Sequence, residues 1–63
     1  SLREKQVLNL LGSGLTIKEI SNNLFLSIKT ISTYKRRIMN KLNLTNIADI
    51  IKFCINNKLI NSN

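Results

Sequence analysis

Apolar residues recur at helical spacing along most of the chain. Ile31, Ile38 and Leu42 are separated by seven and four residues, so they share one face of a helix and can pack together against the rest of the domain. No alternation typical of strands occurs, and the chain contains no proline. The pattern therefore predicts a single all-α domain over residues 1–63, a four-helix bundle with helices at about 2–13, 17–24, 28–42 and 46–57.

Residues typical of helix N-termini precede the first three predicted helices. Ser1 with Glu4, and Thr16 with Glu19, have the spacing of a capping box. In this motif a hydroxyl and a carboxylate satisfy backbone N–H groups reciprocally. Ser27 is predicted to cap the third helix in the simpler way, with its hydroxyl alone.

Residues suited to the left-handed conformation follow two of the predicted helices. Gly14 comes after the first helix and Asn43 after the third. Glycine and asparagine are the residues that most often occupy the position just beyond a C-cap. Thr45 stands two residues after Asn43 and is predicted to cap the fourth helix.

A short helix, a tight connection and a longer helix follow one another in residues 17–42. Phe25 and Leu26 form the connection, and this order is typical of a helix-turn-helix, whose second helix enters the major groove of DNA. The face opposite Ile31 and Ile38 presents Lys29, Ser32, Thr33, Arg36, Arg37 and Asn40. Short side chains near the start of this helix can approach base edges closely, and an arginine further along has the reach for a bidentate contact to guanine.

Basic charge is concentrated in the same segment. Ten Lys and Arg against three acids give a formal net charge of +7, and residues 20–48 contain no acid. Such a charge indicates a polyanionic partner, either nucleic acid or an anionic membrane surface. A membrane-surface helix would carry Trp or Phe opposite its lysines, whereas residues 28–42 offer only Ile, Tyr and Met there. The segment therefore favours nucleic acid.

Few side chains in this sequence support catalysis or metal binding. There is no histidine, Cys54 is the only cysteine, and no two carboxylates lie close in sequence. We therefore expect no enzyme activity, no cofactor and no metal, with Cys54 as a small buried residue in a reducing, cytoplasmic setting. No signal peptide or membrane-spanning run is visible, and the chain opens directly on a helix start. We expect an upstream receiver or ligand-binding domain to be missing.

Several short motifs stand at fixed spacings from one another. They are Arg3-Glu4, Val7-Leu8, Gly14, Thr16-Ile17-Lys18-Glu19-Ile20, Leu24, Ser27-Ile28-Lys29-Thr30-Ile31, Tyr34, Ile38, Lys41-Leu42 and Leu59-Ile60. With these motifs over essentially the whole chain, the sequence resembles the LuxR/FixJ-type helix-turn-helix domain of the NarL/FixJ family. Such domains stand at the C-terminus of bacterial response regulators and quorum-sensing regulators.

This resemblance implies sequence-specific binding of double-stranded DNA by the output domain of a transcription regulator, with a two-component response regulator as the first choice. The positions implied to face base edges are Ser32, Thr33 and Arg36. Those implied to contact phosphates are Lys18, Lys29, Thr30, Tyr34, Lys35, Arg37 and Lys41. RNA polymerase is a further partner to consider. Two alternatives stay open, a quorum-sensing output domain and a protein-interaction module with a degenerate helix-turn-helix.

Three positions depart from the family pattern that the resemblance implies. Tyr34 stands where histidine is common, and its hydroxyl can still reach a phosphate. Asn43 and Lys58 replace glycines. A lysine at position 58 predicts a less tightly turned end to the fourth helix, because side chains other than glycine resist the left-handed conformation.

The fourth predicted helix is apolar over a wide arc. Seven of its nine residues from 47 to 55 are apolar and span roughly 220°, more than one core contact requires. The resemblance implies a homodimer through this helix, with Ile47, Ile50 and Phe53 as candidate interface residues. A twofold dimer would require an inverted repeat in the DNA. The alternative is that part of this face packs on the missing upstream domain.

Overall fold

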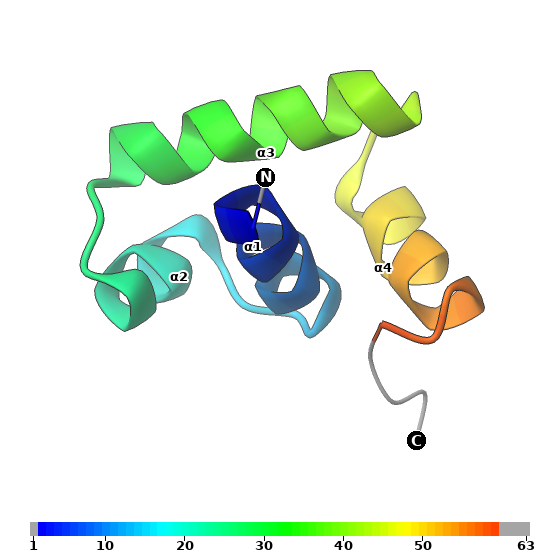
Figure 1. The fold of residues 1–63 in the computed structure, drawn as a ribbon, viewed down its shortest axis with the longest axis horizontal. Helices are drawn as coiled ribbons and strands as arrows, with labels where there is room; N and C mark the ends of the chain where they lie inside the picture. The colour runs from blue at the N-terminus through cyan, green and yellow to red at the C-terminus, as the bar shows by residue number, and fades with distance from the viewer. Residues whose placement is uncertain (1, 60–63) are drawn as a thin grey trace.

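The computed structural model describes residues 2–59, and these form four helices and no strand. The helices are α1 (Leu2–Gly12), α2 (Ile17–Leu24), α3 (Ile28–Leu42) and α4 (Ile47–Asn56), as Figure 1 shows. The predicted all-α architecture is confirmed, with α2 and α3 at their predicted bounds. The first helix ends one residue earlier than predicted, and the fourth is one residue shorter at each end.

Helix α1 lies at the centre of the bundle and contacts each of the other three helices. In Figure 1, α2 and α4 lie on either side of α1, and α3 lies across it. Seven residues drawn from all four helices are buried and form the core: Val7, Leu11, Ile20, Ile31, Ile38, Ile50 and Cys54. Burial raises the pKa of the Cys54 thiol, so this group is neutral and donates to the backbone oxygen of Leu8 at 3.6 Å.

The predicted caps of α2 and α3 are confirmed. The Thr16 hydroxyl accepts from the backbone N–H of Glu19 at 3.1 Å, and the Glu19 carboxylate accepts from the N–H of Thr16 at 2.8 Å. The Ser27 hydroxyl accepts from the N–H of Thr30 at 3.1 Å. Predicted capping by Ser1 lies outside the described residues.

The N-cap of α4 is Asn46, and the prediction of Thr45 for this position was wrong. Asn46 has extended backbone angles, and its side-chain oxygen accepts from the N–H of Asp49 at 2.9 Å. Asparagine is as good an N-cap as serine or aspartate and better than threonine. The Thr45 hydroxyl instead donates to the Asp49 carboxylate at 3.3 Å, so it supports the cap from outside the helix.

All four helices end in the same way, with a residue of positive φ just beyond the last turn. These residues are Gly14, Phe25, Asn43 and Lys58. After each of them, the next residue donates its N–H back to a carbonyl five residues earlier, which is the long hydrogen bond of a Schellman motif. Gly14 and Asn43 confirm their predicted roles. The predicted looser end of α4 was wrong, because Lys58 adopts φ 57° despite its side chain.

A leucine follows each of these left-handed residues. The four are Leu15, Leu26, Leu44 and Leu59, and all are partly buried and pack against the core. An L-residue other than glycine pays about 1–2 kcal/mol for the left-handed conformation. Full burial of a leucine contributes about 1.5–3 kcal/mol, so even partial burial offsets much of that strain. The repeated pairing of a left-handed residue with a leucine explains why three of the four positions tolerate a side chain.

The apolar arc of α4 divides between the core and solvent. Ile50 is fully buried inside this domain, so the prediction that it faces a second copy was wrong. Ile47 is 42% exposed and Ile55 is also exposed, while Phe53 is half-buried. Part of the wide apolar arc of α4 is therefore buried in the core of this domain, and part of it is exposed.

Phe25 provides a test of the strain at the helix ends. Its side chain is 93% exposed, so it contributes little to the stability of the fold. Its φ is 57°, a left-handed conformation that is strained for a residue with a Cβ. We expect Phe25→Gly to raise the free energy of unfolding by about 0.5–1 kcal/mol, measured by urea denaturation. The control is Lys52→Gly on the exposed surface of α4, which should lower that free energy by about 0.5–1 kcal/mol. Destabilisation by both substitutions would contradict the argument.

Candidate nucleic-acid interface

The orientation of α3 is fixed by its buried side. Ile31 is fully buried and Ile38 is 4% exposed, and both pack in the core with Ile20 of α2. Since the two isoleucines are two turns apart, the whole helix is held with one face inward. The opposite face is left to solvent, as the sequence predicted. Its exposed residues are Lys29, Ser32, Arg36, Arg37 and Asn40, and Thr33 lies among them half-exposed.

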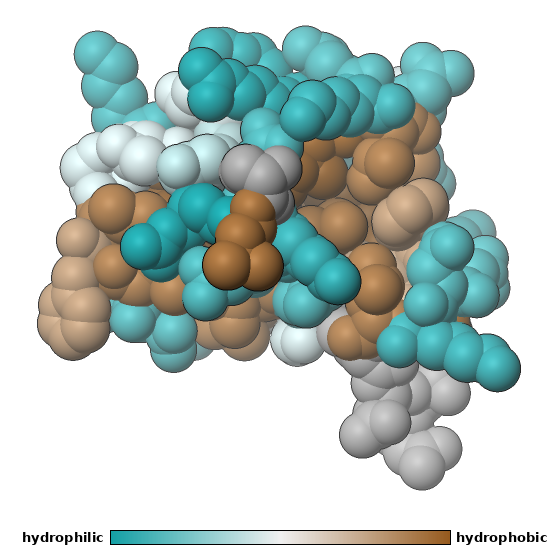
Figure 2. Space-filling model, viewed as in Figure 1, coloured by the Kyte–Doolittle hydropathy of each residue, from teal (hydrophilic) through white to brown (hydrophobic). Residues whose placement is uncertain are grey.

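Figure 2 shows this surface as a hydrophilic band along the outer edge of α3. The band is paler toward the start of the helix, where serine and threonine dominate, and strongly hydrophilic further along. Lys29, Arg36 and Arg37 supply its cations, and α3 contains no acid. The band therefore offers hydrogen-bond donors and positive charge on a narrow, convex ridge.

The first turn of α3 also favours an anion. It contains no acidic side chain, so the positive end of the helix dipole is not neutralised there. The Ser27 hydroxyl donates to the Thr30 hydroxyl at 2.9 Å. Because Thr30 accepts this bond, its own O–H proton can donate to an oxygen outside the protein. The Thr33 hydroxyl donates to the Lys29 carbonyl at 3.1 Å, which holds that side chain close to the helix.

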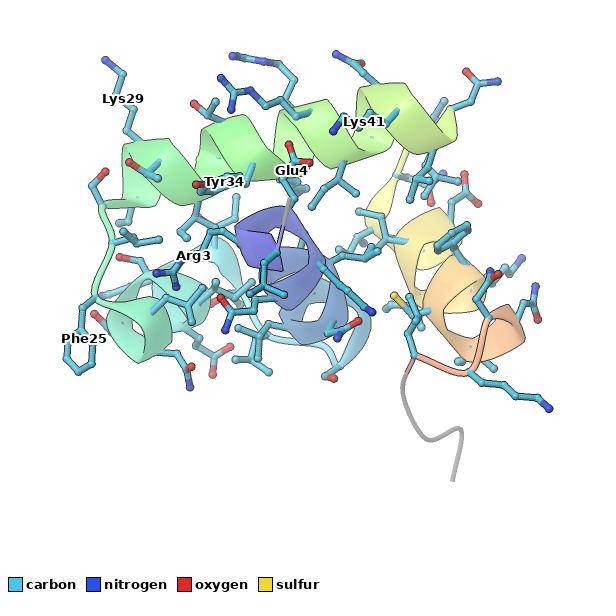
Figure 3. All side chains as sticks on the ribbon, viewed as in Figure 1. Arg3, Glu4, Phe25, Lys29, Tyr34 and Lys41 are labelled. Atoms are coloured by element: carbon cyan, nitrogen blue, oxygen red, sulfur yellow. The ribbon has the colours of Figure 1, made fainter. Side chains whose placement is uncertain are left out.

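One flank of α3 gathers most of the predicted phosphate contacts. Thr30, Tyr34, Arg37 and Lys41 follow one another at steps of four, three and four residues and so lie along the same side. A shallow hollow of about 280 Å³ is lined here by Lys29, Thr30, Thr33, Tyr34 and Arg37. In Figure 3, Lys29 extends away from the body of the domain. Two cations and three hydroxyl groups thus border one concave surface.

Lys41 on the same flank is held by an ion pair that the sequence pattern did not reveal. Its ammonium lies 2.8 Å from the Glu4 carboxylate, which rises from the start of α1 (Figure 3). This hydrogen bond from Lys41 lowers the pKa of Glu4 below its usual value. An ammonium has three N–H donors, so Lys41 can keep this bond and still donate to a phosphate. The sequence pattern places Glu4 in a capping box and in the Arg3-Glu4 motif, and neither gives a signal of a partner 37 residues away.

Lys18 and Lys35 do not join the other predicted phosphate contacts. Lys35 lies on the opposite flank of α3 from Tyr34 and shares a hollow with Lys18 of α2. The structure therefore divides the predicted phosphate contacts into two groups on the two sides of the exposed ridge. The predicted base contacts Ser32, Thr33 and Arg36 lie between them.

The described residues contain neither of two other kinds of site, metal clusters and membrane-spanning helices. Within residues 2–59, no three metal-ligating side chains come together. No helix of this part is long and apolar enough to cross a membrane. The surface that stands out for its chemistry is the cationic ridge of α3 with its two flanks.

Several known proteins are similar to this chain in sequence. The family described as bacterial regulatory proteins, luxR family, matches residues 1–54. The virulence-factor transcription regulator BvgA of Bordetella pertussis is 46% identical over 59 residues, which are 94% of this chain and 28% of that protein. The oxygen regulatory protein NreC of Staphylococcus carnosus is 38% identical over 60 residues, which are 95% of this chain and 28% of that protein.

No solved structure matches the chain significantly. The chain spans just over a quarter of the length of these relatives, so the likeness concerns one domain of each. The family match extends over all four helices up to Cys54, and it includes the complete helix-turn-helix. The chain therefore belongs to the LuxR family of bacterial regulatory proteins, whose helix-turn-helix is the DNA-binding domain of transcription regulators.

Proposed function

We propose that this domain binds double-stranded DNA sequence-specifically, with α3 in the major groove. The observation that carries the proposal is the exposed face of α3, which is free of acid, carries short side chains near its start and is bordered by cations on both flanks. A single α-helix fits the major groove, and its side chains then reach the base edges. The +7 charge of the chain supplies the attraction to phosphates that does not depend on sequence.

Within this proposal, the centre of the ridge reads bases. Arg36 is exposed and long enough for a bidentate contact to the O6 and N7 atoms of guanine. Ser32 and Thr33 lie one turn closer to the helix start and are short enough to approach a base edge directly. The Thr33 hydroxyl donates to the Lys29 carbonyl, so it would act toward DNA as an acceptor.

The two flanks of α3 would then follow the two phosphate backbones that border the major groove. Lys29, Thr30, Tyr34, Arg37 and Lys41 form the group on the α1 side. Lys18 and Lys35 form the group on the other side. Phosphate contacts of this kind fix the position of the protein without reading the sequence.

The kind of full-length regulator that contains this domain is proposed from its similarity to known proteins. The relatives are named as regulators of virulence factors and of oxygen response, and each is more than three times as long as this chain. We infer that the domain is the output part of a two-component response regulator. A quorum-sensing regulator is the second candidate, and RNA polymerase is a further partner under either one. A protein-interaction module with a degenerate helix-turn-helix is disfavoured by the unobstructed cationic face of α3.

Arg36→Ala tests whether the ridge reads sequence. We expect this substitution to weaken binding to the cognate site by about 1–3 kcal/mol and to relax the preference at one base pair. Binding to random duplex DNA should weaken much less, because phosphate contacts remain. Mobility-shift titrations on both duplexes measure the difference. An equal loss on the two duplexes would show that Arg36 contacts only phosphates.

The salt dependence of DNA binding tests the phosphate contacts on the two flanks of α3 separately. We expect Arg37→Ala and Lys35→Ala each to lower the slope of log affinity against log salt by about one unit, since each cation displaces about one counterion. Lys41→Ala should lower it by less, because Glu4 already neutralises part of that charge. Lys52→Ala is the matched control, since this lysine is exposed on α4 and lines neither hollow beside α3. An unchanged slope for Lys35→Ala would confine the DNA contact to the α1 side.

We also propose a homodimer through the exposed edge of α4, formed by Ile47, Ala48 and Ile55. Pairing by a twofold axis would set two copies of α3 about one DNA turn apart on an inverted repeat. Ile55→Asp should then abolish cooperative binding to a palindrome and leave half-site binding and the helical circular dichroism unchanged. Non-cooperative binding by the unmodified chain would refute the dimer. Ile50→Asp does not serve this test, since it would place a charge in the core.

A further inference from the structure

A second surface of the domain lies on the flank of α3 that faces α4. It is an open groove of about 720 Å³ between the α1–α2 turn, the start of α2, α3 and α4. Its walls are mostly aliphatic, with Leu15, Ile17, Ile28, Ile47 and Ile51 among the lining residues. A volume of this size is within the range of known binding sites, about 300–1,000 Å³.

Exposed isoleucines in this groove are not explained by folding. Ile28 is 52% exposed and Ile47 is 42% exposed, and they come from two different helices that meet at the same hollow. Large aliphatic side chains that gather in this way on a surface mark an interaction site more often than scattered ones do. Within the part of the chain that the structure describes, this apolar area is left uncovered.

The charges around the groove are all of one sign. Lys18 and Lys35 are its charged lining residues, and neither forms an ion pair among the described residues.

Each of the three acidic side chains is engaged within the domain, and only Glu19 is bonded to a residue that lines the groove, Thr16. Glu4 pairs with Lys41, Glu19 closes the cap at Thr16, and Asp49 accepts from the hydroxyl of Thr45. Among residues 2–59, no carboxylate forms an ion pair with either of the two groove lysines.

We propose that this groove binds an acidic amphipathic helix of another protein. Such a helix would lay its aliphatic face on Ile28, Ile47 and Ile51, and its flanking carboxylates would pair with Lys18 and Lys35. This is the helix-in-groove mode of recognition, in which the bound helix inserts apolar side chains from positions i, i+3 or i+4, and i+7. Opposite charges at the rim would steer the encounter and fix the register of the helix.

A second copy of the chain does not fit this groove. A second copy placed in the groove would add its own lysines to the cationic rim and offer no acid that is not already engaged. The homodimer proposed above uses Ala48 and Ile55, which do not line the groove, and shares only Ile47 with it. Duplex DNA could contact Lys18 and Lys35 at the rim, but it does not fill the groove, because its backbone offers no apolar groups for the aliphatic walls. The partner that satisfies both the apolar walls and the cationic rim is an acidic, leucine-rich helix.

The groove also leaves the proposed base-reading ridge uncovered. Ile28 and Lys35 lie on the flank of α3, whereas Arg36 and Asn40 lie on its outward face. A helix bound in the groove would therefore leave the outward face accessible. The inference goes beyond the proposed DNA binding. It shares Lys18 and Lys35 with the proposed phosphate contacts, but it rests as well on the aliphatic walls of the groove, which no proposed DNA contact uses.

The test is a titration of the 63-residue chain with a synthetic peptide, followed by amide chemical shifts in NMR. The probe is about 15 residues long, the shortest length at which isolated helices are moderately stable. It carries leucines at i, i+3, i+4 and i+7 and glutamates on both sides of that stripe. Two control peptides replace the glutamates with lysines or the leucines with serines.

We expect the acidic leucine peptide to shift amides around the groove and the two control peptides to bind at least about tenfold more weakly. Ile28→Ser and the charge reversal Lys18→Glu should each weaken binding of the probe by about tenfold. Lys52→Glu changes the net charge by the same amount outside the groove and should have a much smaller effect. Circular dichroism of each variant verifies that the four helices remain.

Three results would overturn the proposal. The first is equal binding of the serine control, which would reduce the contact to nonspecific attraction by a basic chain. The second is groove shifts that appear on concentrating the chain alone, which would assign the groove to a second copy. The third is larger shifts at Ile47 and Ile51, which no proposed DNA contact uses, with an oligonucleotide duplex than with the peptide; this would assign the groove to DNA. Loss of DNA binding by itself would leave the peptide result unchanged, so the two proposals fail separately.

Discussion

Burial of Ile31 and Ile38 in one core with Ile20 is the interaction on which the surface of this domain depends. Two anchors two turns apart prevent α3 from rolling about its axis, because any rotation would withdraw at least one isoleucine from the core. The outward face, the α1 flank and the α4 flank of α3 are consequences of that single orientation. A DNA-reading helix needs this rigidity, since its side chains must meet base edges within hydrogen-bonding distance.

Local signals in the sequence were sufficient for the helices and the ridge. The box of Thr16 with Glu19, the cap by Ser27 and the left-handed Asn43 each depend on residues three to five apart, and all were predicted. The outward face of α3 followed from the seven-residue spacing of its isoleucines. Thr45 was misassigned because Asn46 beside it competes for the same role, and asparagine is the stronger N-cap.

Features that depend on packing between distant segments could not be predicted from periodicity. The arc of α4 looked wide enough for two contacts, but only the fold shows that Ile50 faces inward and Ile47 outward. The pair of Glu4 with Lys41 and the groove shared by α2, α3 and α4 join residues far apart in sequence. The turn at Lys58 was misjudged because its strain was considered without the leucine that follows and packs on the core.

The three acids show how a strongly basic domain can keep its binding surfaces open. Two of them stand in the first turns of α2 and α4, where a carboxylate is stabilised by the helix dipole and by backbone N–H groups. The third joins α1 to the end of α3 through Lys41. Each acid therefore stabilises the fold, and none of them lies on the outward face of α3. Repulsion among the remaining cations destabilises the compact state, and binding a polyanion or an acidic helix would relieve it.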